Sequence, residues 1–173
     1  MKRVSSLAVF LLLGLAGAAQ AADQIVFVVR HAERAPATPT PAGTRSMLGG
    51  DDPPLSTEGR ARAVKLAAML ASADVKSIFT TEFERTRETA APLAAKLKIQ
   101  PIMSAAKDPS ALVETVRNAS GHVLIVGHSN TVPDLLKRLG VKEPITIADA
   151  EYDNLFVVVR RDAGETTLVR LRY

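Results

Sequence analysis

Arginine and histidine side chains follow three separate apolar runs of the sequence, and their types suit one kind of chemistry. Arg30 and His31 follow the first run, Arg85 lies just after the second, and His128 follows the third. A neutral imidazole is a competent nucleophile near pH 7, because its reference pKa is about 6.5. Arginine donates two parallel, charge-assisted hydrogen bonds to phosphate oxygens. The set therefore favours phosphoryl transfer through a covalent intermediate on a histidine.

The three runs are predicted to be strands of one sheet. The first and third runs, residues 25–29 and 123–126, are short, apolar and rich in β-branched types, which is typical of strands buried on both faces. The second run, residues 75–80, is also predicted to be a strand. Ligands bind beyond the carboxyl ends of the strands in an open α/β sheet. We therefore expect the four side chains to meet at one edge of the sheet, although they are far apart in sequence.

Helical spacing of apolar residues separates the strands. The i, i+3, i+4, i+7 pattern predicts one helix that Ser56 or Thr57 caps and a second over about 84–97. Pro92 inside the second helix either kinks the helix or restarts it. The remaining predicted elements are a weak strand at 99–103, a helix over 109–118 capped by Asp108, a helix from Asn130 or Thr131 to Leu139 that Gly140 ends, and strands at 155–160 and 166–172.

Strands that alternate with helices predict an α/β fold. We expect a three-layer α/β/α sandwich with a mostly parallel sheet, to which the last two strands add a C-terminal antiparallel hairpin. Residues 35–54 hold five prolines and three glycines, and are expected to form a loop that shapes the entrance of the site.

The first 21 residues have the order of a cleavable secretory signal. Basic residues precede an apolar run at 7–15, and a small-residue stretch ends at Ala21. The run is shorter than the roughly 20 residues that span a bilayer, so an uncleaved anchor is the less favoured alternative. We expect a 1–21 signal peptide, a single domain over 22–173, and export to a bacterial periplasm or beyond, with no stable membrane anchor after cleavage.

Composition disfavours several other functions. The chain has no cysteine, which excludes disulfides, a thiolate nucleophile and a cysteine-based metal site. The third histidine, His122, opens a strand and is expected to be structural, and no histidine pair has helical metal-ligand spacing. Removal of Lys2 and Arg3 lowers the net charge from +4 to +2, and aromatic residues are few, which disfavours nucleic-acid binding. We expect no metal and no cofactor, and the sequence does not indicate an oligomeric state.

Four motifs resemble one family in the same order along the chain. The segment Val-Val-Arg30-His31-Ala-Glu-Arg34 is similar to the Arg-His-Gly signature of the histidine phosphatase superfamily, the phosphoglycerate-mutase-like group. The resemblance continues in residues 54–60, in residues 78–81 with 85–90, and in residues 126–131. It covers nearly the whole predicted domain and implies a compact, exported bacterial member of that family.

The resemblance also implies roles for matching residues. His31 would be the nucleophile, and Arg30, Arg85 and His128 would surround the phosphoryl group. Arg34 would add a further contact to the substrate. Ala32 stands where glycine is usual in the family, and this change matters only if the residue needs a positive φ.

The sequence departs further from the family pattern where the general acid is expected. Many members place a glutamate in an insertion after the third strand, and here about 18 residues separate Met103 from the strand of His122. We choose Asp108 as the acid, ahead of Glu33 and Glu114. Protonation of the leaving group by solvent is the alternative.

These inferences predict a metal-independent phosphomonoesterase. His31 would attack phosphorus, the leaving oxygen would take a proton from Asp108 or solvent, and water would hydrolyse the phosphohistidine. A mutase is less favoured, because the chain lacks material for a lid that excludes water. The substrate stays open between a small phosphate ester, such as a sugar phosphate or a lipopolysaccharide-core phosphate, and a phosphohistidine protein. The alternative of another class is a non-catalytic phosphate-binding module.

Overall fold

The computed structural model describes residues 23–36, 52–161 and 165–173. The predicted signal peptide, most of the 35–54 loop and the turn of the last hairpin lie outside the described residues. Among the described residues, no helix is long and apolar enough to cross a bilayer. The elements in chain order are β1 (Gln24–Arg30), α1 (Thr57–Leu70), β2 (Val75–Thr80), α2 (Glu84–Leu97), β3 (Ile102–Met103), α3 (Pro109–Asn118), β4 (His122–Gly127), α4 (Val132–Arg138), β5 (Asn154–Arg160) and β6 (Thr166–Arg172).

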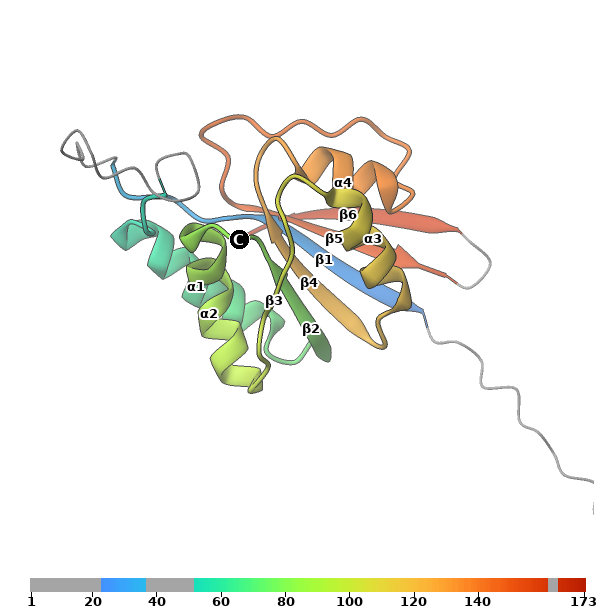
Figure 1. Ribbon diagram of the computed structural model, residues 1–173, viewed down its shortest axis with the longest axis horizontal. Helices are drawn as coiled ribbons and strands as arrows, with labels where there is room; N and C mark the ends of the chain where they lie inside the picture. The colour runs from blue at the N-terminus through green and yellow to red at the C-terminus, as the bar shows by residue number, and fades with distance from the viewer. Residues whose placement is uncertain (1–22, 37–51, 162–164) are drawn as a thin grey trace, which may run out of the picture.

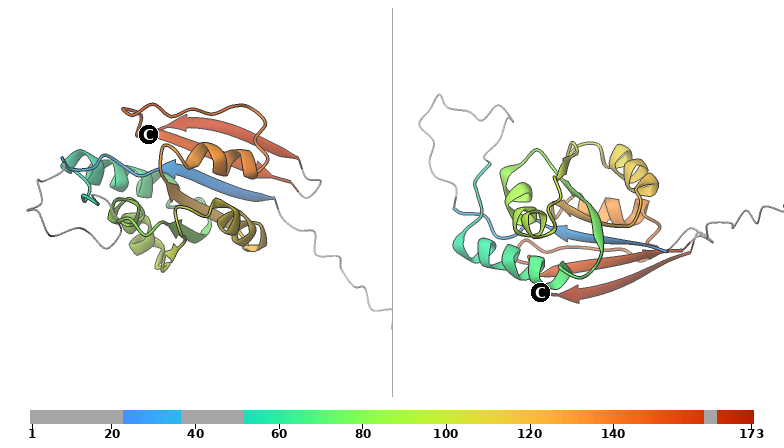
Figure 2. Two further views of the ribbon diagram at one scale, coloured as in Figure 1. Left: turned by 45° about the horizontal axis from the view of Figure 1, so that its top comes forward. Right: turned by 90° about the horizontal axis from the view of Figure 1, so that it is seen from below.

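The strands form one sheet in the order β3-β2-β4-β1-β5-β6 (Figure 1). The strands β1 to β4 run parallel to their neighbours among themselves, whereas β5 runs antiparallel to both β1 and β6. Figure 2 shows the β5–β6 hairpin as the outer edge of the sheet. The mostly parallel sheet with a C-terminal antiparallel hairpin confirms the fold predicted from the sequence.

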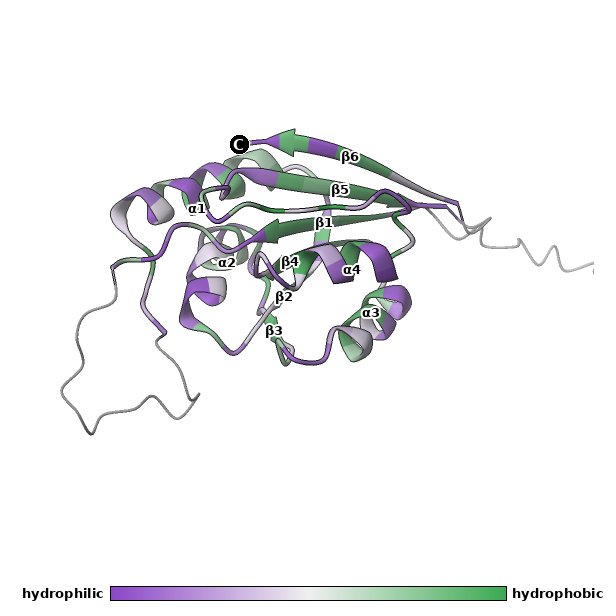
Figure 3. Cartoon of the chain, turned by 90° about the horizontal axis from the view of Figure 1, so that it is seen from above, coloured by the Kyte–Doolittle hydropathy of each residue, from purple (hydrophilic) through white to green (hydrophobic). Residues whose placement is uncertain are grey.

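Alternate side chains of β1 enter two separate layers of the core, because successive strand residues point to opposite faces. Val26 and Val28 pack with α3 and α4, whereas Phe27 and Val29 pack with α1 and α2. Figure 3 shows that β1 and β5 are hydrophobic along most of their length, while the helices carry hydrophilic stretches. Each buried Val, Leu or Phe contributes roughly 1.5–3 kcal/mol to stability, so packing against the sheet stabilises both helical layers.

Two predicted elements take a more definite form in the structure. The helix α2 is continuous from Glu84 to Leu97 and does not restart at Pro92, which removes only one backbone donor from it. The weak strand predicted at 99–103 is reduced to Ile102–Met103, which pairs only with β2. A strand this short at the edge of the sheet offers little backbone for pairing with other chains.

The first turn of α1 packs against the backbone that follows β1. Ser56 Oγ accepts a hydrogen bond from the N–H of Gly59 at 3.1 Å, and the N–H of Ser56 donates to the carbonyl of Glu33 at 2.9 Å. A Cβ atom on Gly59 would lie 2.1 Å from that carbonyl oxygen. Glycine at this position is therefore required by a close approach of two backbones.

Replacing Gly59 by alanine should destabilise the protein, even though alanine is the better helix former by about 1 kcal/mol. Overpacking a close contact costs about 1–3 kcal/mol, and here the clash is with backbone, which cannot rotate away. Urea denaturation should show a lower free energy of unfolding for Gly59→Ala, and no comparable loss for Lys65→Ala on the exposed face of α1. Equal stability of the two variants would contradict this explanation.

Candidate active site

The carboxyl ends of the parallel strands bring the four predicted side chains together. Arg30 ends β1, and the N–H of His31 donates to the carbonyl of Gly127 at the end of β4 at 2.9 Å. The ring centroids of His31 and His128 are 5.3 Å apart. Arg85 Nη2 lies 3.5 Å from Nδ1 of His128. The spatial convergence expected from the strand order is therefore present.

All four residues line one open pocket of about 410 Å³. Arg34, Lys107 and Asp149 line it as well, so basic residues outnumber acidic ones in the lining. Arg30, His31 and His128 are buried, each at 7% exposure or less. A pocket of this charge with buried donors suits an anionic ligand.

The backbone sets the position of the proton on His31. Its Nδ1 lies 2.8 Å from the carbonyl oxygen of Ala32. A carbonyl oxygen only accepts, so Nδ1 carries the proton and Nε2 keeps its lone pair. Burial lowers the pKa of His31 to about 3, and the neighbouring His128 and Arg85 act in the same direction. The ring is therefore neutral at pH 7, with Nε2 available as a nucleophile.

Ala32 fits its position without strain. Among the described residues, positive φ values outside glycine occur only at Asp74 and Lys98, so Ala32 does not need the conformational freedom of glycine. Its side chain is fully buried, and its N–H donates to Thr89 Oγ1 at 2.9 Å. The departure from the family pattern at this residue is therefore tolerated.

Two threonines orient His128. Its Nε2 lies 3.0 Å from Thr81 Oγ1, which in turn lies 3.0 Å from Thr86 Oγ1. Because the Arg85 guanidinium can only donate to Nδ1, the Nε2 atom carries the proton and donates it to Thr81. Burial lowers the pKa of His128 to about 4, and Arg85 contributes further. The role of the threonines was not predicted, although both lie in the segment that carries the family resemblance.

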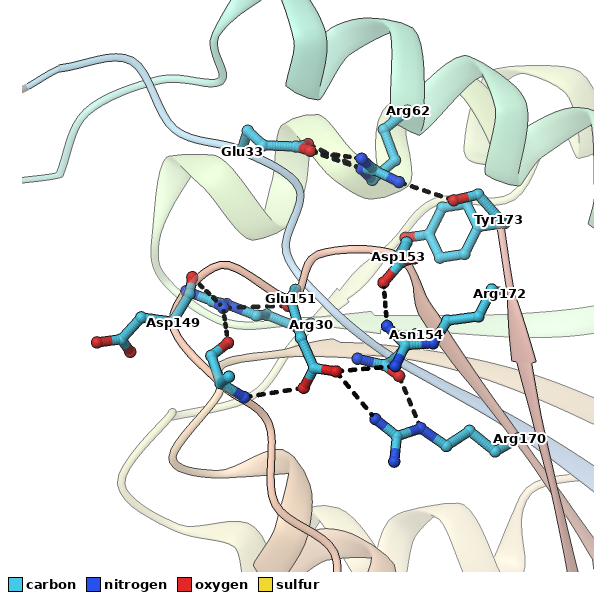
Figure 4. Close-up of polar contacts among 11 residues, drawn as sticks. Arg30, Glu33, Arg62, Asp149, Glu151, Asp153, Asn154, Arg170, Arg172 and Tyr173 are labelled. Atoms are coloured by element: carbon cyan, nitrogen blue, oxygen red, sulfur yellow. Dashed lines mark hydrogen bonds and ion pairs between the residues drawn. The ribbon is translucent and has the colours of Figure 1, made fainter.

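Arg30 is held by a loop, residues 148–151, that no sequence motif links to the site (Figure 4). Its Nη1 donates to the carbonyls of Ala148, Asp149 and Glu151 at 3.1, 2.9 and 3.1 Å. The guanidinium carbon also lies 3.9 Å from the ring centroid of Tyr152. No spacing rule reveals these contacts, because they join the end of β1 to a segment more than a hundred residues later.

Asp52 holds Arg85 in a comparable way. Arg85 Nη1 donates to Asp52 Oδ1 at 3.1 Å, and the N–H of Glu84 donates to Asp52 Oδ2 at 2.8 Å. Both side chains are mostly buried, at 13% and 12% exposure. The aspartate thus orients the arginine and satisfies the N-terminus of α2. The sequence placed Asp52 in the expected entrance loop but gave no reason to pair it with Arg85.

The structure does not bring the predicted acid into the pocket. Asp108 Oδ1 accepts from the N–H of Ala111 at 3.1 Å as the N-cap of α3, and Asp108 is not among the lining residues. Glu33 is bonded to Arg62, and Glu114 lies on the exposed side of α3. The choice of Asp108 is therefore corrected: its carboxylate is engaged by the helix it caps. His122 accepts from the N–H of Ile25 at 3.1 Å, which fits its expected structural role.

A family model described as the histidine phosphatase superfamily (branch 1) matches residues 26–107. Over that segment, which runs from β1 to the loop before α3, the chain is similar to the histidine phosphatase superfamily. This match confirms the resemblance carried by the motifs around His31 and Arg85. Among curated proteins, no sequence matches significantly.

Three solved structures superpose over most of the chain. The protein histidine phosphatase SixA, complexed with tungstate, is 16% identical, with 86% of this chain and 96% of that chain covered and a TM-score of 0.63. A mycobacterial glucosyl-3-phosphoglycerate phosphatase is 15% identical, with 88% and 99% covered and a TM-score of 0.59. Phosphoglycerate mutase from Plasmodium falciparum is 18% identical, with 86% and 90% covered and a TM-score of 0.56. At these identities the likeness shows the fold.

Lowering the pH should destabilise this fold through its two buried rings. In the unfolded chain a histidine takes up a proton near pH 6.5, whereas in the folded chain His31 and His128 do so at about pH 3 and about pH 4. Between these values the unfolded state binds more protons. The free energy of unfolding therefore falls as the pH falls, by about 1.4 kcal/mol per pH unit for each ring.

Chemical denaturation between pH 7 and pH 5 measures this dependence. His31→Asn should remove about half of the histidine contribution. His122→Asn, which keeps an acceptor for the N–H of Ile25, should leave the contribution intact. The same pH slope in wild type and His31→Asn would contradict the low pKa of His31.

Proposed function

We propose that this protein is a phosphatase that hydrolyses a phosphate ester through a phosphohistidine on His31. One observation carries the proposal: a neutral His31, with its Nδ1 proton held by the carbonyl of Ala32, lines the same pocket as Arg30, Arg85 and His128. Such a pocket offers a nucleophile and positively charged donors to the same anion. The match of residues 26–107 to the histidine phosphatase superfamily supports the same reaction class.

The reaction would proceed in two displacements at phosphorus. In the first, Nε2 of His31 forms a bond to phosphorus while the bond to the leaving oxygen breaks, and that oxygen takes a proton. In the second, water attacks phosphorus, the P–N bond breaks, and its electron pair returns to Nε2. Arg30 and Arg85 would bind the equatorial oxygens, where a preorganised donor typically contributes about 3–4 kcal/mol. In this mechanism the arginines supply the positive charge, so we propose that no metal ion is required.

The substrate class rests on less evidence than the reaction. The pocket is open and of about 410 Å³, which supports a small phosphate ester such as a sugar phosphate. Several superposed structures are phosphohistidine phosphatases or phosphatases of small esters, which keeps a phosphohistidine protein as the second candidate. A non-catalytic module is disfavoured, because binding alone does not require a neutral imidazole with a free lone pair.

The location of the activity is proposed from the sequence of the first residues. A cleaved signal at 1–21 would deliver the enzyme to a bacterial periplasm or the medium. The mass of the protein recovered from a periplasmic fraction tests this proposal, with a chain that begins at Ala22 as the expected result. A chain recovered intact in the cytosol would refute it.

Replacing His31 by alanine should abolish turnover while the fold is kept. Without Nε2 no covalent intermediate can form, so hydrolysis of p-nitrophenyl phosphate should fall to background. In wild type, brief incubation with a ³²P-labelled monoester followed by quenching should trap an acid-labile label on His31. Mass spectrometry of the labelled peptide locates the phosphoryl group.

His122→Ala is the matched control for this experiment, because His122 lies at the opposite end of β4 from the pocket. It should keep activity near the wild-type level and still be labelled. Binding of phosphate by wild type without label or turnover would favour the non-catalytic module. Near-normal activity of His31→Ala would refute the proposed mechanism.

A further inference from the structure

The proposed mechanism needs a group that moves a proton to the leaving oxygen. The carboxylates predicted from the sequence for this role, Asp108, Glu33 and Glu114, are engaged elsewhere. The segment between β3 and α3 runs only from Ser104 to Asp108, and Asp108 caps the helix. Protonation of the leaving group by a positioned side chain typically accelerates such a reaction 10²- to 10⁴-fold. The source of that proton must therefore be sought among the residues that line the pocket.

Asp149 is the one carboxylate among the described residues that line this pocket. It is exposed, so it can exchange protons with solvent. No described side chain or backbone N–H donates to its carboxylate. Figure 4 shows the carboxylate projecting away from the contacts that its own backbone makes with Arg30. The side chain is therefore free to meet a ligand.

The backbone of Asp149 is nevertheless fixed relative to the phosphate site. Its carbonyl accepts from Arg30 Nη1 at 2.9 Å, between the similar bonds to Ala148 and Glu151. The loop is anchored from behind, because Glu151 Oε2 accepts from the N–H of Ala148 at 2.9 Å and Glu151 Oε1 accepts from Arg172 at 2.8 Å. Asp149 thus carries an exposed side chain on a backbone that hydrogen bonds hold directly beside a proposed phosphate ligand.

The other carboxylates near the histidines already have partners. Asp52 accepts from Arg85 and from the N–H of Glu84. Glu82 Oε2 accepts from the N–H of Ala106 at 2.9 Å. Both are close enough to influence the pKa of His128, yet neither lines the pocket. If Asp52 moved to a leaving group, the N-terminus of α2 would lose a hydrogen bond. If Glu82 moved there, the loop at Ala106 would lose one.

We infer that Asp149 is the general acid and base of the proposed reaction. This inference rests on the proposed function. In the first displacement the Asp149 carboxylic acid gives its proton to the leaving oxygen as the P–O bond breaks and the P–N bond to His31 forms. In the second, the Asp149 carboxylate takes a proton from the attacking water as the P–O bond forms and the P–N bond breaks. The cycle returns Asp149 to its starting protonation state.

The test is Asp149→Asn with a series of phosphate esters of increasingly basic leaving groups. A nitrophenolate leaves without protonation, whereas an alkoxide needs it. We expect kcat/KM of Asp149→Asn to stay within about threefold of wild type for p-nitrophenyl phosphate, and to fall by about 10²- to 10⁴-fold for an alkyl phosphate. Inhibition by inorganic phosphate should be unchanged, because the contacts to Arg30 come from backbone that asparagine keeps.

Asp108→Asn is the matched control, and it compares the two aspartates directly. It should keep wild-type kcat/KM for every ester, and it should keep its fold, because asparagine caps a helix about as well as aspartate does. A selective loss for alkyl esters in Asp108→Asn and not in Asp149→Asn would overturn the inference. An equal loss for all esters in Asp149→Asn would also overturn it, since that pattern indicates a positioning role. If wild type hydrolyses none of the esters, the proposed function fails and the inference fails with it.

Discussion

The parallel pairing of β1 with β4 sets Arg30 opposite Gly127, so that His31 and His128 leave the sheet as neighbours. Every feature of the site depends on this register. A shift of one residue would move each apolar side chain of β1 to the opposite core layer and would move His31 away from His128. The hydrogen bond from the N–H of His31 to the carbonyl of Gly127 extends the pairing by one residue into the site. Core packing and the geometry of the pocket are therefore specified by the same strand.

The pocket combines buried arginine with neutral imidazole, and each needs a different form of support. Burying a guanidinium is costly unless its donors have partners. Carbonyls of the 148–151 loop accept from Nη1 of Arg30, although its Nε is buried without a partner among the described residues, and Asp52 accepts from Arg85. Burial keeps both rings uncharged and so leaves His31 with a free lone pair. Oriented cations beside a neutral nucleophile form an environment prepared for a phosphate before it arrives.

Much of this arrangement could be predicted from the sequence, because local rules apply to its parts. The apolar runs and helical spacing predict the helices at 84–97 and 109–118 with the bounds that the structure has. Brief motifs at the ends of strands identify His31, Arg85 and His128 as neighbours. Their catalytic roles stay a proposal, but their convergence follows from the rule that parallel strands end at one edge of the sheet.

The residues that orient the site's histidines and arginines could not be predicted in this way. Asp52, Thr81 and the loop around Asp149 act through contacts between segments that are distant in sequence, and each residue type is common in loops and strand ends. Asp108 illustrates the opposite error: it was correctly identified as a helix cap, and that local role is the reason it does not reach the pocket. An aspartate can cap a helix or protonate a leaving group, and the sequence alone does not show which of these two roles its carboxylate has.

The central claim is that His31, Arg30, Arg85 and His128 together bind one phosphoryl group in line with Nε2 of His31. A crystal structure of the protein with vanadate tests this most directly, because vanadate adopts the five-coordinate geometry of a phosphoryl group in transfer. We predict vanadium bonded to Nε2 of His31, with its equatorial oxygens contacted by both arginines and by His128. Vanadate bound elsewhere, or bound in the pocket without a bond to His31, would contradict the account.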